Sequence, residues 1–355
     1  MNESLIVAEV TPRGVPWTGG VEAHVQNLST ALREQGARVQ VLTQTTEYGD
    51  DKRIPGDGGD EHVDGVTYHR FRLPLRGVWE VPNWRLLREV RRSARRSSVV
   101  HVHSFHQPLA FLTAVTLVGV RVPLVFTPHY HGTGHTRLAI WLHKVWRPTA
   151  GQYLMRRADA IVVVSQPEAD LLVRHFPFVQ GRVHVIPNGI VPPATCPIDA
   201  VGTPAQDANG TVVLSVGRLA PYKRHDTVIE AIAQTPHSVS LVLVGEGSDR
   251  GRLESLAQRL GVADRVLFAG RVGDDELAAW WARADVFVSM SEQEAFGLAL
   301  GEALAAGVPA VVADIPAFRY VADLASARGA PEGSVQRANE ASLPEAITRP
   351  GPRFA

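Results

Sequence analysis

Residues 286–306 read VFVSMSEQEAFGLALGEALAA, and this stretch predicts one complete strand–loop–helix unit. The apolar run at 286–289 is typical of a buried strand, and the run at 298–306 is typical of a helix that begins just after Gly297. Glu294 lies in the loop and Glu302 lies about one turn into the helix. Ligands of open α/β sheets bind outside the carboxyl ends of strands, so we expect this loop to be functional.

The same alternation of strands and helices continues in both directions from this stretch. Further strands are predicted at 5–10, 38–43, 66–71, 99–103, 122–127, 160–165, 183–186, 211–216, 241–244, 266–269 and 310–313. Several of them are continuous apolar runs, which is typical of parallel strands covered on both faces. The alternation is interrupted by a segment rich in Pro, Gly, Asp and Asn at 187–210. We therefore expect two Rossmann-like, doubly wound α/β domains, 1–190 and 211–355, joined by a linker at 191–210 and facing across a ligand-binding cleft.

Composition narrows the class of protein. The 355 residues suit two domains, and the 36 basic and 36 acidic residues cancel, which argues against a broad nucleic-acid-binding surface. The single cysteine, Cys196, is expected to be an inert thiol. The N-terminus lacks the basic region of a signal peptide, and the longest apolar stretch, 109–120, is shorter than the roughly 20 residues of a membrane span. We expect a soluble, cytoplasmic protein of unspecified oligomeric state.

Two further loops follow predicted strands. Thr18, Gly19 and Gly20 precede a predicted helix, where two glycines would let backbone amides approach an anion; an ordinary tight turn remains the alternative. Gly217 and Arg218 end the strand at 211–216, and Lys223 follows five residues later. This cationic pair suits a diphosphate, although a solvated surface pair has the same sequence.

The two glutamates also allow two interpretations. Glu294 would accept hydrogen bonds from sugar hydroxyls and Glu302 from a ribose diol, because their separation suits one extended ligand. The spacing argues mildly against a general acid–base pair, which needs both carboxylates beside one bond. The alternative is a helix N-terminal carboxylate with an exposed glutamate.

Histidines and arginines form two other groups. His129, His131 and His135 lie in TPHYHGTGH, but the loop lacks zinc-ligand spacing, so we expect no metal and interpret a histidine here as lining a cleft. His101 and His103 alternate in a strand and are expected to be core or strand-end histidines. The arginine-rich segment 84–96 is interpreted as a solvated helix face; peripheral membrane contact is possible for such a helix but not favoured.

The order and spacing of these segments resemble glycosyltransferase family 4, whose members are retaining enzymes with the GT-B fold. The resemblance rests on TGGVEAHVQNLSTALREQGARVQVLTQ at 18–44, VVHVHS at 99–104, FTPHYHG at 126–132, RADAIVVVS at 157–165, VIPNGI at 185–190, LSVGRLAPYK at 214–223, LVGEG at 243–247, the Glu294–Glu302 spacing and EALAAGVPAVVAD at 302–314. It covers the chain to about residue 325.

The resemblance implies a role for each matching position. Catalytic positions would be His129 beside the transferred sugar, Arg218 and Lys223 on the diphosphate, and Glu294. Gly19, Gly20, Gly217, Gly245, Arg271, Phe296, Gly297, Leu298 and Glu302 would bind the donor. The implied activity is metal-independent, retaining transfer from a nucleoside diphosphate sugar, with UDP the favoured nucleotide, to a small hydroxylated acceptor such as a cyclitol, an aminocyclitol or a natural-product precursor. No cofactor is implied.

Some positions depart from the family pattern. Val191 replaces a common Asp, Met290 and Ser291 replace a common Pro-Ser pair, and 316–320 lacks the usual Gly-Gly-x-Pro-Glu, which leaves the donor sugar open. The resemblance also implies a long C-terminal helix, whereas the Pro-rich residues 326–355 predict a shortened tail. A nucleotide-sugar epimerase and a non-catalytic nucleotide-sugar-binding protein remain alternatives, which product analysis and turnover assays would distinguish.

Overall fold

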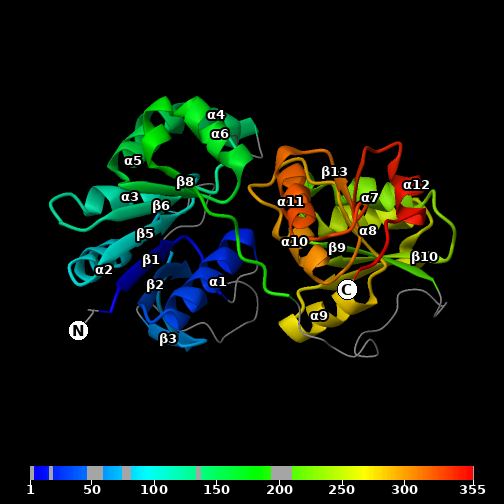
Figure 1. Ribbon diagram of the computed structural model, residues 1–355, viewed down its shortest axis with the longest axis horizontal. Coiled ribbons are helices and arrows are strands. Elements are labelled where there is room, and N and C mark those ends of the chain that lie inside the picture. Colours follow the sequence, from blue (N-terminus) through cyan, green and yellow to red (C-terminus); the bar gives the residue numbers. More distant parts are fainter. Residues whose placement is uncertain are drawn as a thin grey trace. The chain divides into compact units, whose positions relative to one another are not determined.

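The structure, a computed structural model, describes residues 4–15, 19–45, 59–73, 81–132, 137–192 and 210–354. It divides into two compact units, unit 1 (residues 1–189) and unit 2 (residues 190–355) (Figure 1). Each described unit contains a largely parallel sheet with helices on its faces, which confirms the α/β class expected from the sequence.

Unit 1 is built on an eight-stranded sheet, counted over the described residues, in the order β3-β4-β2-β1-β5-β6-β7-β8. Its strands are β1 (Ile6–Thr11), β2 (Arg38–Thr45), β3 (Gly59–Val63), β4 (Val66–Arg72), β5 (Val99–His103), β6 (Leu124–Thr127), β7 (Ala160–Val163) and β8 (Val183–Val185). Its helices are α1 (Gly20–Glu34), α2 (Trp84–Ala94), α3 (Pro108–Thr116), α4 (Arg137–Trp146), α5 (Gln152–Arg157) and α6 (Gln166–His175), with a π-helical turn at Arg147–Gly151 and a 3-10 turn at Pro177–Arg182.

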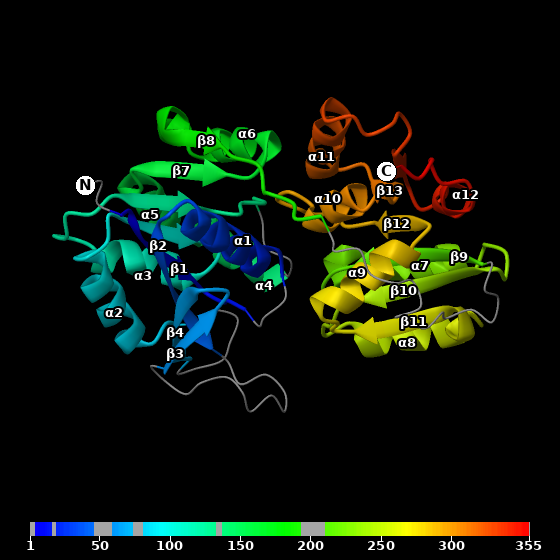
Figure 2. The ribbon, with the colours of Figure 1, turned by 60° about the horizontal axis from the view of Figure 1, so that its bottom comes forward.

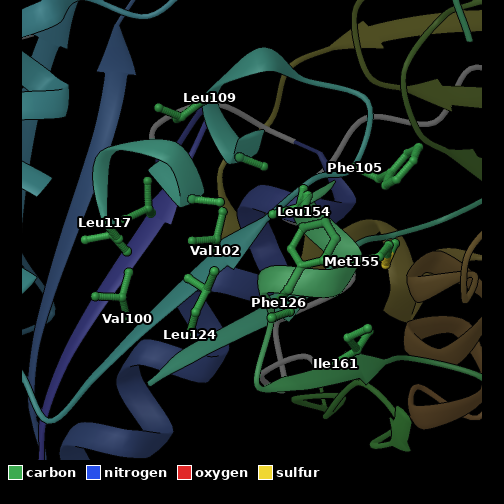
Figure 3. Close-up of a cluster of buried hydrophobic side chains, with 14 of the residues drawn as sticks. Val100, Val102, Phe105, Leu109, Leu117, Leu124, Phe126, Leu154, Met155 and Ile161 are labelled. Atoms are coloured by element: carbon green, nitrogen blue, oxygen red, sulfur yellow. The ribbon is translucent and has the colours of Figure 1, made fainter. Parts of the chain in front are cut away.

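The two faces of this sheet bury different side chains. Val41, Val66 and Tyr68 pack with Val25 of α1, whereas the neighbouring Leu42 belongs to the large cluster on the other face. Figure 3 shows that larger cluster where side chains of β5, β6 and β7 meet α3 and α5; the labelled members are Val100, Val102, Phe105, Leu109, Leu117, Leu124, Phe126, Leu154, Met155 and Ile161. Both faces are therefore apolar along the central strands, as the continuous apolar runs predicted.

Unit 2 repeats the architecture with a six-stranded parallel sheet, again over the described residues, in the order β11-β10-β9-β12-β13-β14 (Figure 2). The strands are β9 (Thr211–Val216), β10 (Val239–Val244), β11 (Val266–Gly270), β12 (Val286–Ser289), β13 (Ala310–Ala313) and β14 (Val335–Ala338). The helices are α7 (His225–Ile232), α8 (Arg250–Arg259), α9 (Asp274–Arg283), α10 (Leu298–Ala305), α11 (Pro316–Ala327) and α12 (Leu343–Thr348), with 3-10 turns at Pro221–Lys223 and Ala263–Arg265.

Several elements differ from the sequence-based expectation. Strand β3 pairs antiparallel with β4 through Asp64 and Gly65, both at positive φ, and its alternating polar residues gave no apolar run to recognise. Strand β6 begins at Leu124 rather than at residue 122. The tail also contains regular structure: β14 extends the sheet beside β13, and Leu343 and Ile347 of α12 are buried in the core of unit 2.

Candidate functional site

The order of strands in unit 2 reverses between β9 and β12, which places the loops that follow these two strands side by side. The backbone amide of Glu292, after β12, donates to the carbonyl of Tyr222, after β9, at 2.9 Å. A reversal of strand order is the usual ligand-binding position in open α/β sheets. The segments that carry the predicted donor residues are therefore tied together at this position.

A cation and a carboxylate meet where these loops touch. Lys223 Nζ lies 2.6 Å from Glu294 Oε1, and the two side chains are only 17% and 18% exposed. Burial alone would lower the pKa of Lys223, but the Glu294 carboxylate outweighs it and raises that pKa above its ordinary value. Lys223 therefore carries its charge at neutral pH. Arg218 is exposed and close enough for its charge to oppose that of Lys223, so two cations share this position.

The backbone beside this pair is kept free of side chains by close packing. Gly245 has a φ of +139°, and a Cβ atom there would lie 2.0 Å from the carbonyl oxygen of Gly217. The amide of Gly217 in turn donates to the carbonyl of Val244 at 2.9 Å. Only glycine fits at position 245, so the ends of β9 and β10 present backbone beside Lys223.

The loop after β12 ends at the N-terminus of α10. Gly297 caps this helix with a φ of +100°, and a Cβ atom there would approach the ring of Phe318 to 2.9 Å. Glycine has no side chain that could cap the first turn, so the amides of Leu298, Ala299 and Leu300 are left for an anion or a hydroxyl group, whereas Gly301 donates to the carbonyl of Gly297. Phe296, just before the cap, is buried.

Glu302 and Arg271 lie farther along the same edge. Burial, with a smaller contribution from Asp274, raises the pKa of the Glu302 carboxyl, which forms no hydrogen bond or ion pair with any residue that the structure describes. Arg271 follows β11, and its Nη2 lies 3.8 Å from Oε2 of Glu246. Glu302 is thus a half-buried acceptor without an internal donor, as a ribose-binding group would be.

Two of the predicted residues of unit 1, Gly19 and Gly20, lie where the strand order reverses between β1 and β5, and His129 lies one strand away, after β6. Gly19 caps α1 without a side-chain hydrogen bond, and Gly20 begins the helix. His129 follows β6 with a φ of +47°, which is unusual for a residue with a side chain, and is only 9% exposed. Thr18, His135, Cys196 and most of the expected linker lie outside the described residues.

Buried polar contacts surround His129. His103 Nε2 lies 2.7 Å from Glu9 Oε2, and both side chains are fully buried, while His101 Nδ1 lies 3.2 Å from the same oxygen. Burial alone would raise the pKa of Glu9, but the two histidines lower it, so Glu9 is ionised. Burial and His101 lower the pKa of His103 to about 3, so its ring is neutral. His101 and His103 are buried, as expected from the sequence.

Sequence reasoning missed three residues of this region. His24 of α1 contacts both His103 and His129 through ring edges, with centroids 5.5 and 5.0 Å away. Asn188 accepts from His24 across 2.7 Å. Glu168 accepts from the backbone amides of Tyr130 at 2.5 Å and Val164 at 2.8 Å, which holds the loop that carries His129.

These omissions have identifiable causes. His24 lies in a segment that the sequence analysis used only for its glycines, and a periodic apolar helix gave no reason to single it out. Glu168 follows Ser165, whose hydroxyl oxygen accepts from the Glu168 amide at 3.2 Å as a helix cap. A glutamate in the first helical turn is common for reasons of helix stability alone, so its second role was hidden.

Comparison with known proteins gives two family matches. The model of Glycosyltransferase Family 4 matches residues 18–192, and that of Glycosyl transferases group 1 matches residues 203–342. A D-inositol 3-phosphate glycosyltransferase of Xylanimonas cellulosilytica is 30% identical over 90% of this chain and 81% of the relative. A GDP-mannose:cellobiosyl-diphosphopolyprenol alpha-mannosyltransferase of Komagataeibacter xylinus is 28% identical over 89% of this chain and 77% of the relative.

Solved structures share the fold. Alr3699/HepE of Anabaena, in complex with UDP and glucose, matches with a TM-score of 0.73 at 20% identity, covering 97% of this chain and 89% of that one. Sucrose-phosphate synthase of Thermosynechococcus elongatus matches with a TM-score of 0.70 at 23% identity and the same coverage. Among the described residues, no helix has both the length and the apolar character needed to cross a bilayer.

Proposed function

The chain belongs to glycosyltransferase family 4, and we propose that it transfers a sugar from a UDP-sugar to a small hydroxylated acceptor with retention of anomeric configuration. Its GT-B fold, expected from the sequence, is confirmed by the solved structures that it matches. The Xylanimonas cellulosilytica relative is named a glycosyltransferase, and the name of the Komagataeibacter xylinus relative gives GDP-mannose as the donor, so a glycosyltransferase with a nucleotide-sugar donor is the coarser statement. The nucleotide, the acceptor and the stereochemistry are the parts that we propose.

The donor's diphosphate would be neutralised by side chains rather than by a metal ion. Arg218 and Lys223 supply two positive charges. The backbone amides of Phe296, Gly297 and Leu298, at the N-terminus of α10, would hold the sugar and the β-phosphate. Lys223 keeps its charge despite burial because Glu294 lies 2.6 Å away. Glu294 would accept bonds from sugar hydroxyls, and Glu302 from the ribose diol. The main chain near Arg271 would bind the base.

The chemical step needs a stabilised leaving group. The bond between the anomeric carbon and the diphosphate oxygen breaks, and its electron pair stays on the diphosphate, whose growing charge Arg218 and Lys223 stabilise. The acceptor hydroxyl attacks the face that the diphosphate leaves, and its proton passes to a diphosphate oxygen. Attack on this face retains the configuration of the anomeric carbon and needs no nucleophile from the protein. His129 and the amides of Gly19 and Gly20 are proposed to contact the transferred sugar and its phosphate.

The acceptor is proposed to be a cyclitol, an aminocyclitol or a related polyol. The relative from Xylanimonas cellulosilytica, which carries the name of a D-inositol 3-phosphate glycosyltransferase, supports this class. The name of the Komagataeibacter xylinus relative includes a diphosphopolyprenol, so the transfer assay should also include a lipid-linked acceptor. We propose that the enzyme is cytoplasmic and that the arginine-rich face of helix α2 is exposed to solvent.

The contact between Lys223 and Glu294 at the reversal of strand order carries this proposal. A panel of UDP-, GDP- and dTDP-sugars tests it by thermal unfolding, since a ligand at 100 times its dissociation constant stabilises by about 2.7 kcal/mol. We expect a UDP-sugar to give the largest shift, and a glycosylated polyol to form when inositol or its phosphate is added. Donor conversion without acceptor would indicate an epimerase, and donor binding without any turnover would indicate a binding protein.

A further inference from the structure

Three histidines of unit 1 each have one buried ring nitrogen without a hydrogen-bond partner among the described residues. These atoms are Nε2 of His24 in α1, Nδ1 of His103 at the end of β5 and Nε2 of His129 after β6. We propose that His24 and His103 are positioning residues that hold His129 in its Nε2–H tautomer through one shared water. Nδ1 of His129 is then left to accept a hydrogen bond from a hydroxyl group of the transferred sugar. The contact with the sugar rests on the proposed function, whereas the tautomer does not.

The three rings are spaced to share one hydrogen-bonding partner. Each ring offers one nitrogen such that the three atoms lie within 4.8 Å of one another. Partners placed tetrahedrally around a water at about 2.9 Å lie about 4.7 Å apart. A buried water usually makes about three hydrogen bonds to polar groups that lack other partners. The spacing therefore suits one water between the three rings.

Two of the rings already donate their other nitrogen elsewhere. The Glu9 carboxylate can only accept, so His103 donates through Nε2 at 2.7 Å and keeps a lone pair on Nδ1. His24 donates through Nδ1 to the side-chain oxygen of Asn188 at 2.7 Å and keeps a lone pair on Nε2. Both unpartnered nitrogens are therefore acceptors.

His129 must then be the donor of the group. A water has two hydrogens, and it gives one to His24 and one to His103. Its oxygen can accept a third bond, which only an N–H on Nε2 of His129 supplies. The opposite tautomer would direct a third lone pair at the same water and leave one buried acceptor without a hydrogen, which costs free energy. A neutral imidazole has one N–H, so Nδ1 of His129 keeps its lone pair.

The rings are neutral, as this arrangement requires. Burial lowers the pKa of all three histidines, and for His129 the nearby His24 and His103 lower it further. A protonated His129 would carry a hydrogen on both nitrogens and could not accept from a hydroxyl group. The ionised Glu9 stays an acceptor for His103.

The backbone of His129 is fixed by its own contacts, so the tautomer decides what the ring presents to a ligand. His129 has a φ of +47° and is only 9% exposed. The next amide, that of Tyr130, donates to Glu168 at 2.5 Å, and Glu168 also accepts from Val164 at 2.8 Å. The ring of His24 meets that of His129 edge-on, with the centroids 5.0 Å apart. The ring of His129 thus has neighbours on its backbone side and on its Nε2 side.

Two-bond proton–nitrogen correlation spectra of the full chain, labelled at histidine, test the tautomer at neutral pH without any sugar transfer. The His129→Gln variant identifies the signals of His129 by their loss, and His129→Asn serves if that variant is unfolded. We expect the shift of a protonated nitrogen at Nε2 and that of an unprotonated nitrogen at Nδ1. The opposite assignment, or an average of the two, overturns the proposal.

Variants at His24 test the positioning role. His24→Phe keeps a ring but removes the acceptor, so the water has a free hydrogen for His129 and both tautomers become possible. We expect mixed tautomers and a kcat about fivefold lower, the effect of one hydrogen bond, with KM for the acceptor unchanged. His24→Gln, which keeps an acceptor oxygen, should retain the Nε2–H tautomer and most of the rate. His184→Phe, at an exposed histidine of the same unit, is the matched control and should match the wild type.

Each outcome decides the proposal. Circular dichroism establishes folding, and Asn188→Leu replaces His24→Phe if the latter is unfolded, because His24 is then free to donate through Nε2. A folded His24→Phe variant that keeps the single tautomer and the wild-type kcat overturns the positioning role, as does a His24→Gln variant that is equally impaired. Absence of any transfer by the wild type would refute the proposed function and leave the spectra to decide the tautomer.

Discussion

Unit 2 carries the Lys223–Glu294 pair where its strand order reverses, and unit 1 carries His24, His103 and His129 (the histidine cluster) at or beside its own reversal. The electrostatics of the two places are opposite. In unit 2 a carboxylate at 2.6 Å keeps a largely buried lysine charged. In unit 1 the histidines lie so deep that burial lowers their pKa values and leaves them neutral. The same backbone topology therefore carries a buried ion pair in one unit and a set of neutral imidazole rings in the other.

The two units differ in charge because they differ in what replaces the water that a buried side chain has lost. A buried charge persists only when an opposite charge or several hydrogen bonds replace the lost water. Glu294 does this for Lys223, whereas Glu9 is shared between His101 and His103, and its charge only partly opposes the effect of burial on His24. Lys223 therefore stays charged and the histidines stay neutral, because only the lysine has an opposite charge that replaces the lost water.

The largest expected effect comes from removing the charge of unit 2. Lys223→Ala should lower kcat by about 10²–10³-fold, because the leaving diphosphate loses a charge that is fixed in place before the reaction. Steady-state transfer rates with a saturating donor measure this loss. Lys144→Ala, at an exposed lysine of unit 1, is the control and should transfer at the wild-type rate. A Lys223→Ala rate within about twofold of the wild type would contradict the assignment, since one missing hydrogen-bond donor in such a site costs more.

The next largest effect is the change with pH in the free energy of unfolding that is due to Glu168 of unit 1. The carboxyl group of Glu168 is protonated in the folded protein at mildly acidic pH. Burial raises the pKa of Glu168 to about 7 from an ordinary 4.5, although the amides of Tyr130 and Val164 partly oppose this shift. The folded protein therefore binds a proton that the unfolded chain releases between these values. The stability from this group is fully present below about 4.5 and is lost as the pH rises through about 7.

Glu168→Gln removes this titration and isolates its contribution. Glutamine has one acceptor oxygen for two backbone amides, so the variant carries a constant penalty at every pH. Between pH 5 and pH 8 the free energy of unfolding of the variant, relative to the wild type, should rise by up to about 3 kcal/mol. Urea unfolding at several pH values measures the difference, in which the contributions of the histidines cancel. An unchanged difference between pH 5 and pH 8 would show that Glu168 titrates normally.

The sequence could predict that the segments of Lys223 and Glu294 meet in unit 2, because both follow strands within a few residues. Arg218 and Lys223 come directly after one apolar run and Glu294 after another, and parallel strands bring such loops together at one edge. The histidine cluster could not be predicted in the same way. It joins a helix face, a strand end and a loop, and which face of α1 carries His24 toward His129 depends on tertiary packing. Strand β3 was not predicted for a related reason. Its sequence has no apolar run, and the strand is stabilised by its pairing with β4.

A smaller effect is expected at the glycine that begins α10. Gly297→Ala places a Cβ atom 2.9 Å from the ring of Phe318 at a φ of +100°, so it should destabilise unit 2 by about 1–3 kcal/mol and weaken donor binding by moving the helix N-terminus. Gly251→Ala is the matched control. It lies inside α8 with nothing within 4 Å of the added atom, and it should be neutral or stabilising. Equal unfolding midpoints for the two variants would show that the conformation of Gly297 is not required.

The smallest effect tests how much a surface ion-pair network contributes beside the site. Arg224 has a φ of +52° and contacts Glu292 at 3.1 Å, Asp226 at 3.3 Å and Glu340 at 2.5 Å. Arg224→Ala loses the ion pairs but keeps the unfavourable backbone conformation, whereas Arg224→Gly loses the ion pairs and relieves it. The glycine variant should therefore be the more stable of the two by about 1 kcal/mol, and each should lie within about 1–2 kcal/mol of the wild type because exposed ion pairs contribute little. Paired urea unfolding curves measure both differences. Equal stabilities of the alanine and glycine variants would show that the positive φ at Arg224 carries no strain in solution.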